Sequence, residues 1–342
     1  MQKAKKRLFS VTAVLLAVLV ALTALLPTAG AAQAATMRSK YTGKSYTHNA
    51  RFNKLEVLNG VDISAWQEKV NWKKIKNDGI DFAILRAGYG KNASQEDAYF
   101  ATNFKNATAA GLPVGIYWYS YAKSVADVEK EARLCLQVLG SRTLDLPVFY
   151  DLEESSQLNK GKAFCTQLVE HFCSIIAAAG HTPGLYMSRS PLLDYIEQET
   201  RGRYALWVAE YGSKTCKYDG DYLMWQYADN GKVAGVNGHT DMDFLYGNKN
   251  SLPGSATLLK SKTYTGKAIT PAPTVTGEDG QPLKADKDYT LTYINNKAVG
   301  MATITAQGLG TYTGRRWYYR FKILPAKVTG LTLESRSKTR LT

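Results

Sequence analysis

Residues 140–154, GSRTLDLPVFYDLEE, show the turn and strand pattern that decides the fold. Gly140 is expected to end a helix, because glycine readily adopts the left-handed conformation of a helix C-terminus. Pro147 is expected to open the β-strand over residues 148–153. The same combination of a helix-ending glycine and a strand-opening proline recurs on both sides of this stretch, at Gly111 with Pro113 and at Gly180 with Pro183. Repeated helix ends followed at once by strand starts predict a chain of β-α units.

Five such units are expected between residues 60 and 199. Their strands are predicted at 60–66, 82–86, 114–121, 148–153 and 184–188, and their helices at 72–77, 95–110, 125–139, 161–179 and 192–199. Three closely spaced β-type runs follow without helices, at 205–211, 222–227 and 241–245. Eight mostly parallel strands predict an α/β fold, a TIM-like barrel with an irregular last third. A doubly wound open sheet is the alternative, but it would place a glycine-rich turn where residues 62–66 read DISAW.

The composition and periodicity of the chain change beyond residue 250. Residues 255–325 are rich in Thr, Tyr, Val and Gly and have no helical period, which predicts a small all-β sandwich module. The phrases YTGK at 264–267 and YTG at 312–314 resemble those of the immunoglobulin-like modules of bacterial surface proteins. Residues 326–342 are similar to the first strand of a fibronectin type III domain. Because so short a fragment cannot bury a core, we expect a truncated and disordered module start there.

The N-terminus has the pattern of a secretory signal peptide. A basic head at residues 3–7 precedes an apolar run at 8–26, and the Ala-Gln-Ala at 32–34 is typical of a cleavage site. An uncleaved membrane anchor is the alternative, since the apolar run is about long enough to span a bilayer. The sequence therefore predicts a signal peptide over 1–34, a linker over 35–57, and a secreted protein without stable membrane insertion after cleavage.

The chain is strongly basic. Its 43 Lys and Arg against 29 Asp and Glu give a net charge of +14, and about +10 remains without the four basic residues of the leader. The positive residues are scattered and no nucleic-acid recognition motif is present, so nucleic acid is not expected as a partner. For a secreted protein, the anionic polymers of the cell wall are the expected partners of this charge.

Four cysteines remain in the predicted mature chain, and no C-x-x-C pair occurs. Cys165 and Cys173 lie eight residues apart on a predicted helix, on one face but too far apart to bond to each other. Buried thiols are the main expectation for these two, for Cys135 and for Cys216. A disulfide from Cys135 to one of the two helix cysteines stays open, because export permits oxidation.

The sharpest candidate site is the pair Asp151 and Glu153 at the end of the fourth predicted strand. Alternate residues of a strand share a face, so the two carboxylates are expected on one side with Leu152 on the other. Two carboxylates in one site do not ionise easily together, and the less solvated one holds its proton toward neutral pH. Glycosidic cleavage needs such an asymmetric pair. Helix capping or plain surface charge is the alternative interpretation.

Other polar groups are expected at the same barrel end, because reactive residues of parallel barrels gather at the C-terminal strand ends. Asp62 on the first strand and Asp241 on the last are expected to meet, since these strands adjoin in a closed barrel. Arg86, Tyr119 and Gln226 also lie at strand ends. We predict that all five contribute to substrate binding.

Aromatic residues fall on or just after many predicted strands. They are Trp66, Tyr117, Trp118, Tyr119, Tyr121, Tyr186, Trp207, Tyr211, Trp225 and Tyr227. Flat rings suit the apolar faces of sugars, and we select Tyr186 and Trp207 as substrate contacts, although core packing is the alternative for more than half of the set. The four histidines have no metal-ligand spacing and no G-x-S-x-G elbow occurs, so neither a metal, another cofactor nor a serine nucleophile is expected.

With these residues in place, residues 58–250 resemble glycoside hydrolase family 25, a family of lysozymes. Seven phrases carry the resemblance in the family's order: GVDIS at 60–64, FAILRAGYG at 82–90, VGIYWY at 114–119, YDLE at 150–153, LWVAEY at 206–211, WQY at 225–227 and TDMD at 240–243. The resemblance implies a β5α5β3 barrel. It also implies N-acetylmuramidase action on the β-1,4 bond of peptidoglycan glycan strands, with retention of configuration.

The resemblance also implies residue roles. Glu153 matches the general acid/base, and Asp151 matches the neighbouring carboxylate that orients the substrate's N-acetyl group or stabilises the cation. Asp62 and Asp241 match further acidic residues of the site. Where the family often has Asn, this chain has Asp243, which we expect to add a negative charge and to shift the pH optimum.

Two other function classes remain as alternatives. A non-catalytic glycan-binding protein would keep the same barrel, and it is distinguished by replacing Glu153 with Gln. An adhesive role of the β module is compatible with the enzyme, and wall retention after deletion of 255–342 tests it.

Overall fold

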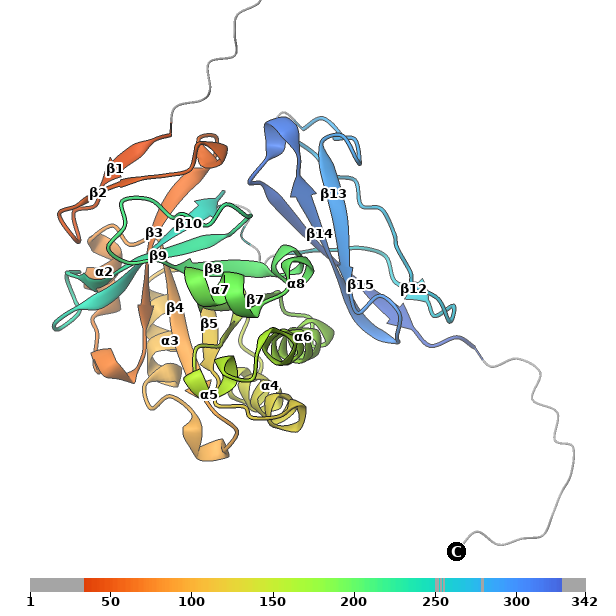
Figure 1. The fold of residues 1–342 in the computed structure, drawn as a ribbon, viewed down its shortest axis with the longest axis horizontal. Helices are drawn as coiled ribbons and strands as arrows, with labels where there is room; N and C mark the ends of the chain where they lie inside the picture. Colours follow the sequence, from red (N-terminus) through yellow and green to blue (C-terminus); the bar gives the residue numbers. More distant parts are fainter. Residues whose placement is uncertain (1–33, 250–251, 253, 255, 278–279, 328–342) are drawn as a thin grey trace, which may run out of the picture.

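The computed structural model describes residues 34–249, 252, 254, 256–277 and 280–327. This part of the chain folds into a closed eight-stranded barrel and a five-stranded sheet beside it (Figure 1). The predicted signal peptide, apart from Ala34, lies outside the described residues, as does the predicted fragment 326–342 apart from its first two residues. No helix within the described ranges is long and apolar enough to cross a membrane.

The barrel confirms the predicted α/β, TIM-like architecture and excludes the doubly wound open sheet. Its strand order is β10-β3-β4-β5-β6-β7-β8-β9, and β10 alone runs antiparallel to both its neighbours. The strands are β3 (Glu56–Ile63), β4 (Phe82–Tyr89), β5 (Val114–Tyr119), β6 (Val148–Asp151), β7 (Pro183–Ser188), β8 (Ala205–Ala209), β9 (Met224–Gly231) and β10 (Thr240–Gly247).

Helices cover the outside of the first five strands. They are α2 (Trp72–Asn77), α3 (Phe100–Ala109), α4 (Val125–Leu139), α5 (Ser155–Leu158), α6 (Lys162–Ala178), α7 (Arg189–Tyr195) and α8 (Gln198–Arg203). The predicted single helix over 192–199 is wrong, because α7 and α8 replace it. Ile196 between them is extended and fully buried in the core, which interrupts the helix.

Glycines make room for large side chains inside the barrel. A Cβ on Gly60 would collide with the ring of Phe82, and a Cβ on Gly184 would collide with the ring of Phe149. Both rings are completely buried. The interior is therefore a packed core, which fixes the positions of the strand ends that carry polar residues.

Residues 35–57, predicted to be a linker, are instead folded onto the barrel. The strands β1 (Thr36–Arg38) and β2 (Ser45–Thr47) form a hairpin. The ring of Tyr46 packs edge-on against Trp225 and Tyr227, at 5.7 and 4.5 Å. The physical reason is that no helix follows β8 or β9, so the aromatic outer face of β9 and β10 needs another cover, and the N-terminal segment supplies it.

The C-terminal unit is all-β, but its described residues form a single sheet and not two facing ones. The sheet contains β11 (Thr257–Leu258), β12 (Lys262–Thr263), β13 (Tyr289–Ile294), β14 (Gly300–Gly308) and β15 (Arg316–Leu324). A non-strand stretch provides the second layer, since Val275, Ile269 and Leu283 pack with the buried residues of this sheet.

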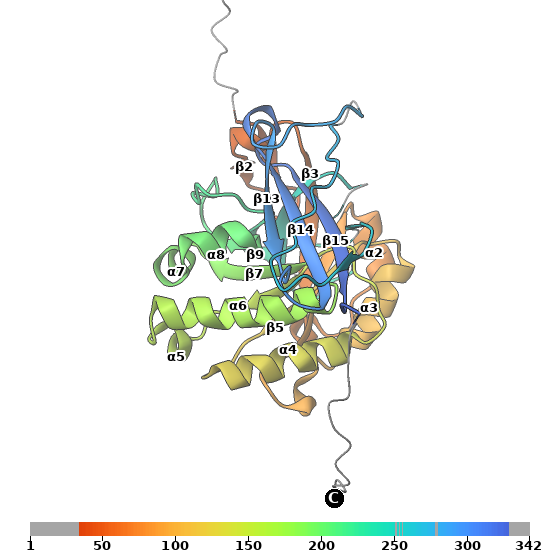
Figure 2. The ribbon, with the colours of Figure 1, turned by 90° about the vertical axis from the view of Figure 1, so that its right-hand side faces the viewer.

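This unit docks at the barrel end where the parallel strands begin (Figures 1 and 2). Asn295 donates to the backbone oxygen of Ser174 on α6 at 2.7 Å, and Arg320 donates to Thr182, just before β7, at 3.1 Å. The carboxyl ends of the strands lie at the opposite end of the barrel, away from these contacts.

All four cysteines are buried and free, without a disulfide.

Candidate active site

Four carboxyl groups meet at the C-terminal ends of the parallel strands. We call this part of the surface, formed by Asp62, Asp151, Glu153 and Asp241, the carboxylate face. Asp62 is the last residue but one of β3, and Asp151 is the last residue of β6. Asp241 is the second residue of the antiparallel β10, and Glu153 follows β6. Asp241 is the direct Cα partner of Asp62, as predicted from barrel closure. The charges of Asp241 and Asp151 both act on Asp62. The residues predicted on the first, fourth and eighth barrel strands, now β3, β6 and β10, therefore lie together.

Asp151 and Glu153 differ in solvation, although Glu153 lies two residues beyond the strand on which we expected it. Asp151 is 4% exposed, and Leu152 is buried in the core between barrel and helices. The Glu153 side chain reaches solvent, although its carboxyl is partly desolvated by its neighbours. Burial and the charge of Glu153 raise the pKa of Asp151 well above its usual range, against the opposing charge of Arg86. Desolvation and the charge of Glu154 raise the pKa of Glu153, while Tyr119 opposes the rise.

A chain of hydrogen bonds fixes Asp62. Gln226 on β9 donates from Nε2 to Asp62 Oδ2 at 2.7 Å. Tyr186 on β7 donates to Gln226 Oε1 at 2.7 Å, and Tyr211 donates to the same oxygen. The two hydroxyls set the orientation of the Gln226 amide, so that its NH2 group faces Asp62.

Asp243 lies deeper in the barrel than Asp241 and is completely buried. Its Oδ1 accepts a hydrogen bond from Trp207 Nε1 at 2.7 Å, and no described cation pairs with it. Burial raises the pKa of Asp243 well above its usual range, and the Asp241 charge adds to the rise. The additional negative charge expected at Asp243 stays a prediction, and burial without a cation opposes it.

Two predicted substrate contacts have other partners. Trp207 is 2% exposed, so its indole supports Asp243 from inside the barrel and does not present a face to a sugar. Arg86 Nε pairs with the buried Asp97 Oδ2 at 2.7 Å. The same oxygen accepts from the backbone N of Ala65 at 2.9 Å. Arg86 thus ties β4 to the loop after β3 and lowers the pKa of Asp151 through its charge.

Sequence reasoning missed two acidic residues of this face. Tyr119 donates to Glu154 Oε1 at 2.7 Å, and burial raises the pKa of the Tyr119 hydroxyl well above its usual range. Glu154 directly follows Glu153, so adjacency was an available signal. Asp97 lies in the loop before α3, which begins at Phe100 and not at residue 95 as predicted, and no signal marks Asp97 as the partner of Arg86.

Exposed aromatic rings lie after three of the strands. Trp66 is 83% exposed after β3, Tyr121 is 45% exposed after β5, and Tyr211 is 42% exposed after β8. Large exposed aromatics are uncommon on a folded surface, and their flat apolar faces suit sugar rings. They are better candidates for stacking than the buried Trp207.

The model of glycosyl hydrolases family 25 matches residues 61–236, just over half of the 342-residue chain. The chain belongs to this family. The matched range contains Asp62, Asp151 and Glu153, and it ends before Asp241. The chain is accordingly a glycoside hydrolase with the barrel of that family.

Three relatives illustrate the family membership. The chain is 30% identical to the uncharacterized protein YegX of Escherichia coli O157:H7 over 206 residues, covering 57% of this chain and 72% of that protein. It is 26% identical over 186 residues to the autolytic lysozyme of Clostridium acetobutylicum, covering 54% of this chain and 55% of the lysozyme. The structure of a family 25 glycosyl hydrolase from Bacillus anthracis superposes with a TM-score of 0.51 at 21% identity, covering 58% and 92% of the two chains, and supports the shared fold.

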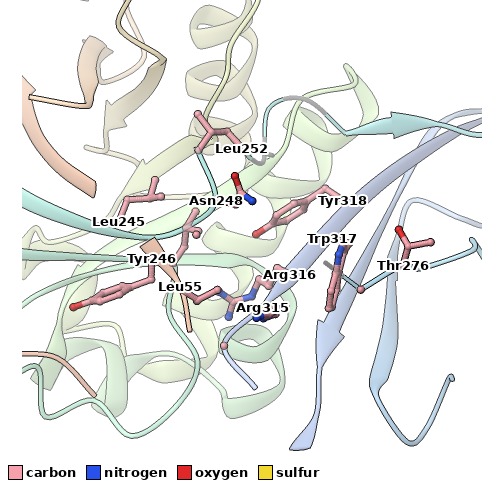
Figure 3. Close-up of a pocket in the computed structure, with 14 residues that line it drawn as sticks. Leu55, Leu245, Tyr246, Asn248, Leu252, Thr276, Arg315, Arg316, Trp317 and Tyr318 are labelled. Atoms are coloured by element: carbon pink, nitrogen blue, oxygen red, sulfur yellow. The ribbon is translucent and has the colours of Figure 1, made fainter. Parts of the chain in front are cut away.

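A separate cavity of about 290 Å³ lies between the family 25 barrel and the β unit (Figure 3). Leu55, Leu245 and Tyr246 line it from the barrel, and Trp317 and Tyr318 line it from β15. None of the four carboxylates is among its lining residues, so this cavity is distinct from the carboxylate face. Within the described ranges, no group of three or more His, Cys, Asp or Glu side chains is arranged to hold a metal ion.

Proposed function

We propose that this family 25 hydrolase is a peptidoglycan muramidase that hydrolyses the β-1,4 bond between N-acetylmuramic acid and N-acetylglucosamine with retention. The observation that carries the proposal is the pair of Asp151 and Glu153 at the C-terminal end of the barrel, in which the buried Asp151 feels the charge of the exposed Glu153. Peptidoglycan is the proposed substrate because the family relatives include an autolytic lysozyme.

Glu153 is the proposed general acid and base. Its raised pKa keeps a proton available for the leaving oxygen, and its exposure lets a glycan approach. Asp151 is the proposed partner that orients the N-acetyl group of the substrate or stabilises the oxocarbenium-like centre. Its Oδ1 is buried without a hydrogen-bond partner among the described residues, which leaves one acceptor free for an amide N–H.

The remaining residues of the face are proposed to position the sugars. Asp62 and Asp241 offer carboxyl oxygens, and burial raises the pKa of Asp241 to about 6. Gln226 donates to Asp62 and accepts from Tyr186, while the Tyr119 hydroxyl lies beside Glu153 and Glu154. Arg86 is proposed to act by holding the loop after β3 and by its charge on Asp151.

The cellular setting is part of the proposal. A secreted protein that keeps a net charge of about +10 without its leader is suited to the anionic polymers of the wall. Residues 58–250 are the proposed catalytic barrel. Residues 255–325 are the proposed immunoglobulin-like module.

Digestion of purified peptidoglycan with mass spectrometry of the products tests the reaction. The proposal expects new reducing ends on N-acetylmuramic acid, whereas reducing-end N-acetylglucosamine or cleaved peptides would contradict it. Glu153→Gln should lower turnover by about 10²- to 10⁴-fold while wall binding persists. Glu96→Gln, an exposed carboxyl outside the pair, is the matched control. Unchanged turnover in Glu153→Gln would instead indicate a glycan-binding protein.

A further inference from the structure

A hollow of about 560 Å³ lies beside the carboxylate face. The β1–β2 hairpin forms one wall, and the loop after β8 with the end of β9 forms the other. Its lining residues are Arg38, Gly43, Lys44, Ser45, Tyr46, Tyr211, Gly212, Ser213, Lys214, Tyr227, Ala228, Asp229 and Asn230. We call this site the basic hollow, because three of these side chains are cations.

The three cations, Arg38, Lys44 and Lys214, are exposed, and none of them forms an ion pair with a described carboxylate. Asp229 is the single acidic residue of the lining. The basic hollow is therefore positive, directly beside a face that carries four carboxyl groups. The surface charge thus changes from negative to positive over a short distance. This change favours a ligand that has both neutral sugar parts and anionic parts.

Tyr211 connects the basic hollow to the carboxylate face. Its ring lines the hollow, while its hydroxyl donates to Gln226, which in turn donates to Asp62. A chain bound across Asp62 thus reaches the basic hollow over one aromatic side chain.

Backbone and side-chain hydrogen bonds hold the walls in place. Thr47 N donates to the backbone oxygen of Lys214 at 2.7 Å, so the hairpin and the loop after β8 are joined directly. Ser39 Oγ and Tyr227 Oη lie 3.0 Å apart, and Lys232 N donates to Tyr41 O at 3.0 Å. The hairpin precedes residues 61–236, which match the family model.

We propose that the basic hollow binds the carboxylates of the peptide branches on the glycan strand that lies across the carboxylate face. The proposal rests on the proposed function, because only peptidoglycan brings peptide branches to this face. A branch is covalently attached to the strand, so its carboxylates arrive beside the catalytic pair. Lysine and arginine side chains form charge-assisted hydrogen bonds with carboxylates.

The test removes the three charges together. The variant Arg38→Gln, Lys44→Gln, Lys214→Gln keeps the backbone contacts of the hairpin, since Lys44 and Lys214 form their hydrogen bonds to neighbouring residues with backbone atoms. The matched control is Lys105→Gln, Lys130→Gln, Arg133→Gln, which removes three exposed cations on α3 and α4. Both variants lose the same net charge. The substrates are peptide-bearing glycan strands and the same strands after removal of the peptides by an amidase, both free of phosphate polymers.

We expect KM of the hollow variant to rise about tenfold on peptide-bearing strands, with kcat unchanged, because three exposed charge pairs are lost. On peptide-free strands the hollow variant, the control and the wild type should agree. The difference should also disappear at about 1 M salt, where the screening length is short.

An equal rise in KM on both substrates, or no rise at all, would overturn the proposal. So would a defect that appears only on walls that still carry phosphate polymers, since the occupant would then be the polymer. Binding of a soluble muropeptide to Glu153→Gln, with and without the three substitutions, separates this proposal from the catalytic one. If the wild type cleaves neither substrate but the substitutions still weaken muropeptide binding, the proposed function fails and the basic hollow stands. Equal muropeptide binding would overturn the basic hollow whatever the catalytic result.

Discussion

Glu131 on α4 is a completely buried carboxyl that takes no part in the proposed reaction. Its Oε2 accepts from Ser120 Oγ at 2.8 Å and from the Tyr150 hydroxyl at 3.1 Å, and its Oε1 accepts from the backbone N of Tyr121 at 2.8 Å. These bonds hold the turn that follows β5. Burial outweighs them and raises the pKa of Glu131 from 4.5 to about 7.

This rise makes folding stability depend on pH. The folded protein holds the Glu131 proton more tightly than the unfolded chain does, so the contribution is fully present below pH 4.5 and is lost as the pH rises through 7. At about 1.4 kcal/mol per pH unit, the free energy of unfolding loses about 3 kcal/mol from this one group. Glu131→Gln stays neutral at every pH and so removes this dependence.

Urea unfolding of the wild type and of Glu131→Gln, followed by tryptophan fluorescence from about pH 4 to pH 8, measures the effect. At low pH the wild type should be the more stable by about 1 to 3 kcal/mol. The substituted amide places an NH2 group against groups that donate to the carboxyl of Glu131 in the wild type. That advantage should decrease by about 3 kcal/mol toward pH 8. Glu197→Gln, which changes an exposed carboxyl on the same molecule, is the control. A wild-type advantage that stays constant across this range would refute the reasoning.

Further substitutions test other features of the barrel. Asp243→Asn keeps an acceptor for Trp207, and burial raises the pKa of Asp243 well above its usual range, so we expect neither limb of the pH-rate profile to move by more than about half a pH unit. A larger shift would mean that Asp243 is charged. Trp66→Ala should raise KM for glycan about fivefold with kcat nearly unchanged in steady-state assays, and an unchanged KM would exclude stacking. Gly184→Ala should destabilise the barrel by about 1 to 3 kcal/mol in urea unfolding, because the new Cβ meets the Phe149 ring; undiminished stability would show that the interior has room.

The elements predicted best are those specified by neighbouring residues. The helix expected over 125–139 is α4 with the same bounds, and the Ser124 side chain caps it by accepting from Asp127 N. The β1–β2 hairpin was missed because its stability comes from distant partners. Tyr46 packs against Trp225 and Tyr227, about 180 positions away, and no local pattern indicates that contact.

The candidate site shows a second limit of sequence reasoning. Strand alternation indicates which side chains point into the barrel, but not how deep each one lies. Trp207 and Gln226 both point inward, yet Gln226 donates to Asp62 while Trp207 donates to the deeper Asp243. Depth depends on the stagger between neighbouring strands, which the order of residues along one strand does not contain.

The N-terminal hairpin and the β unit lie at different distances from the carboxylate face. The β unit meets the barrel where the parallel strands begin, through Ser174 and Thr182, whereas the carboxylate face is at the other end. A ligand held by the β unit therefore does not compete with a glycan at Glu153. The N-terminal hairpin instead joins the loop after β8 through Lys214, beside Tyr211 and the residues that hold Asp62. Changes in the hairpin should consequently alter the choice of glycan substrate, while changes in the β unit should alter only where the enzyme is retained.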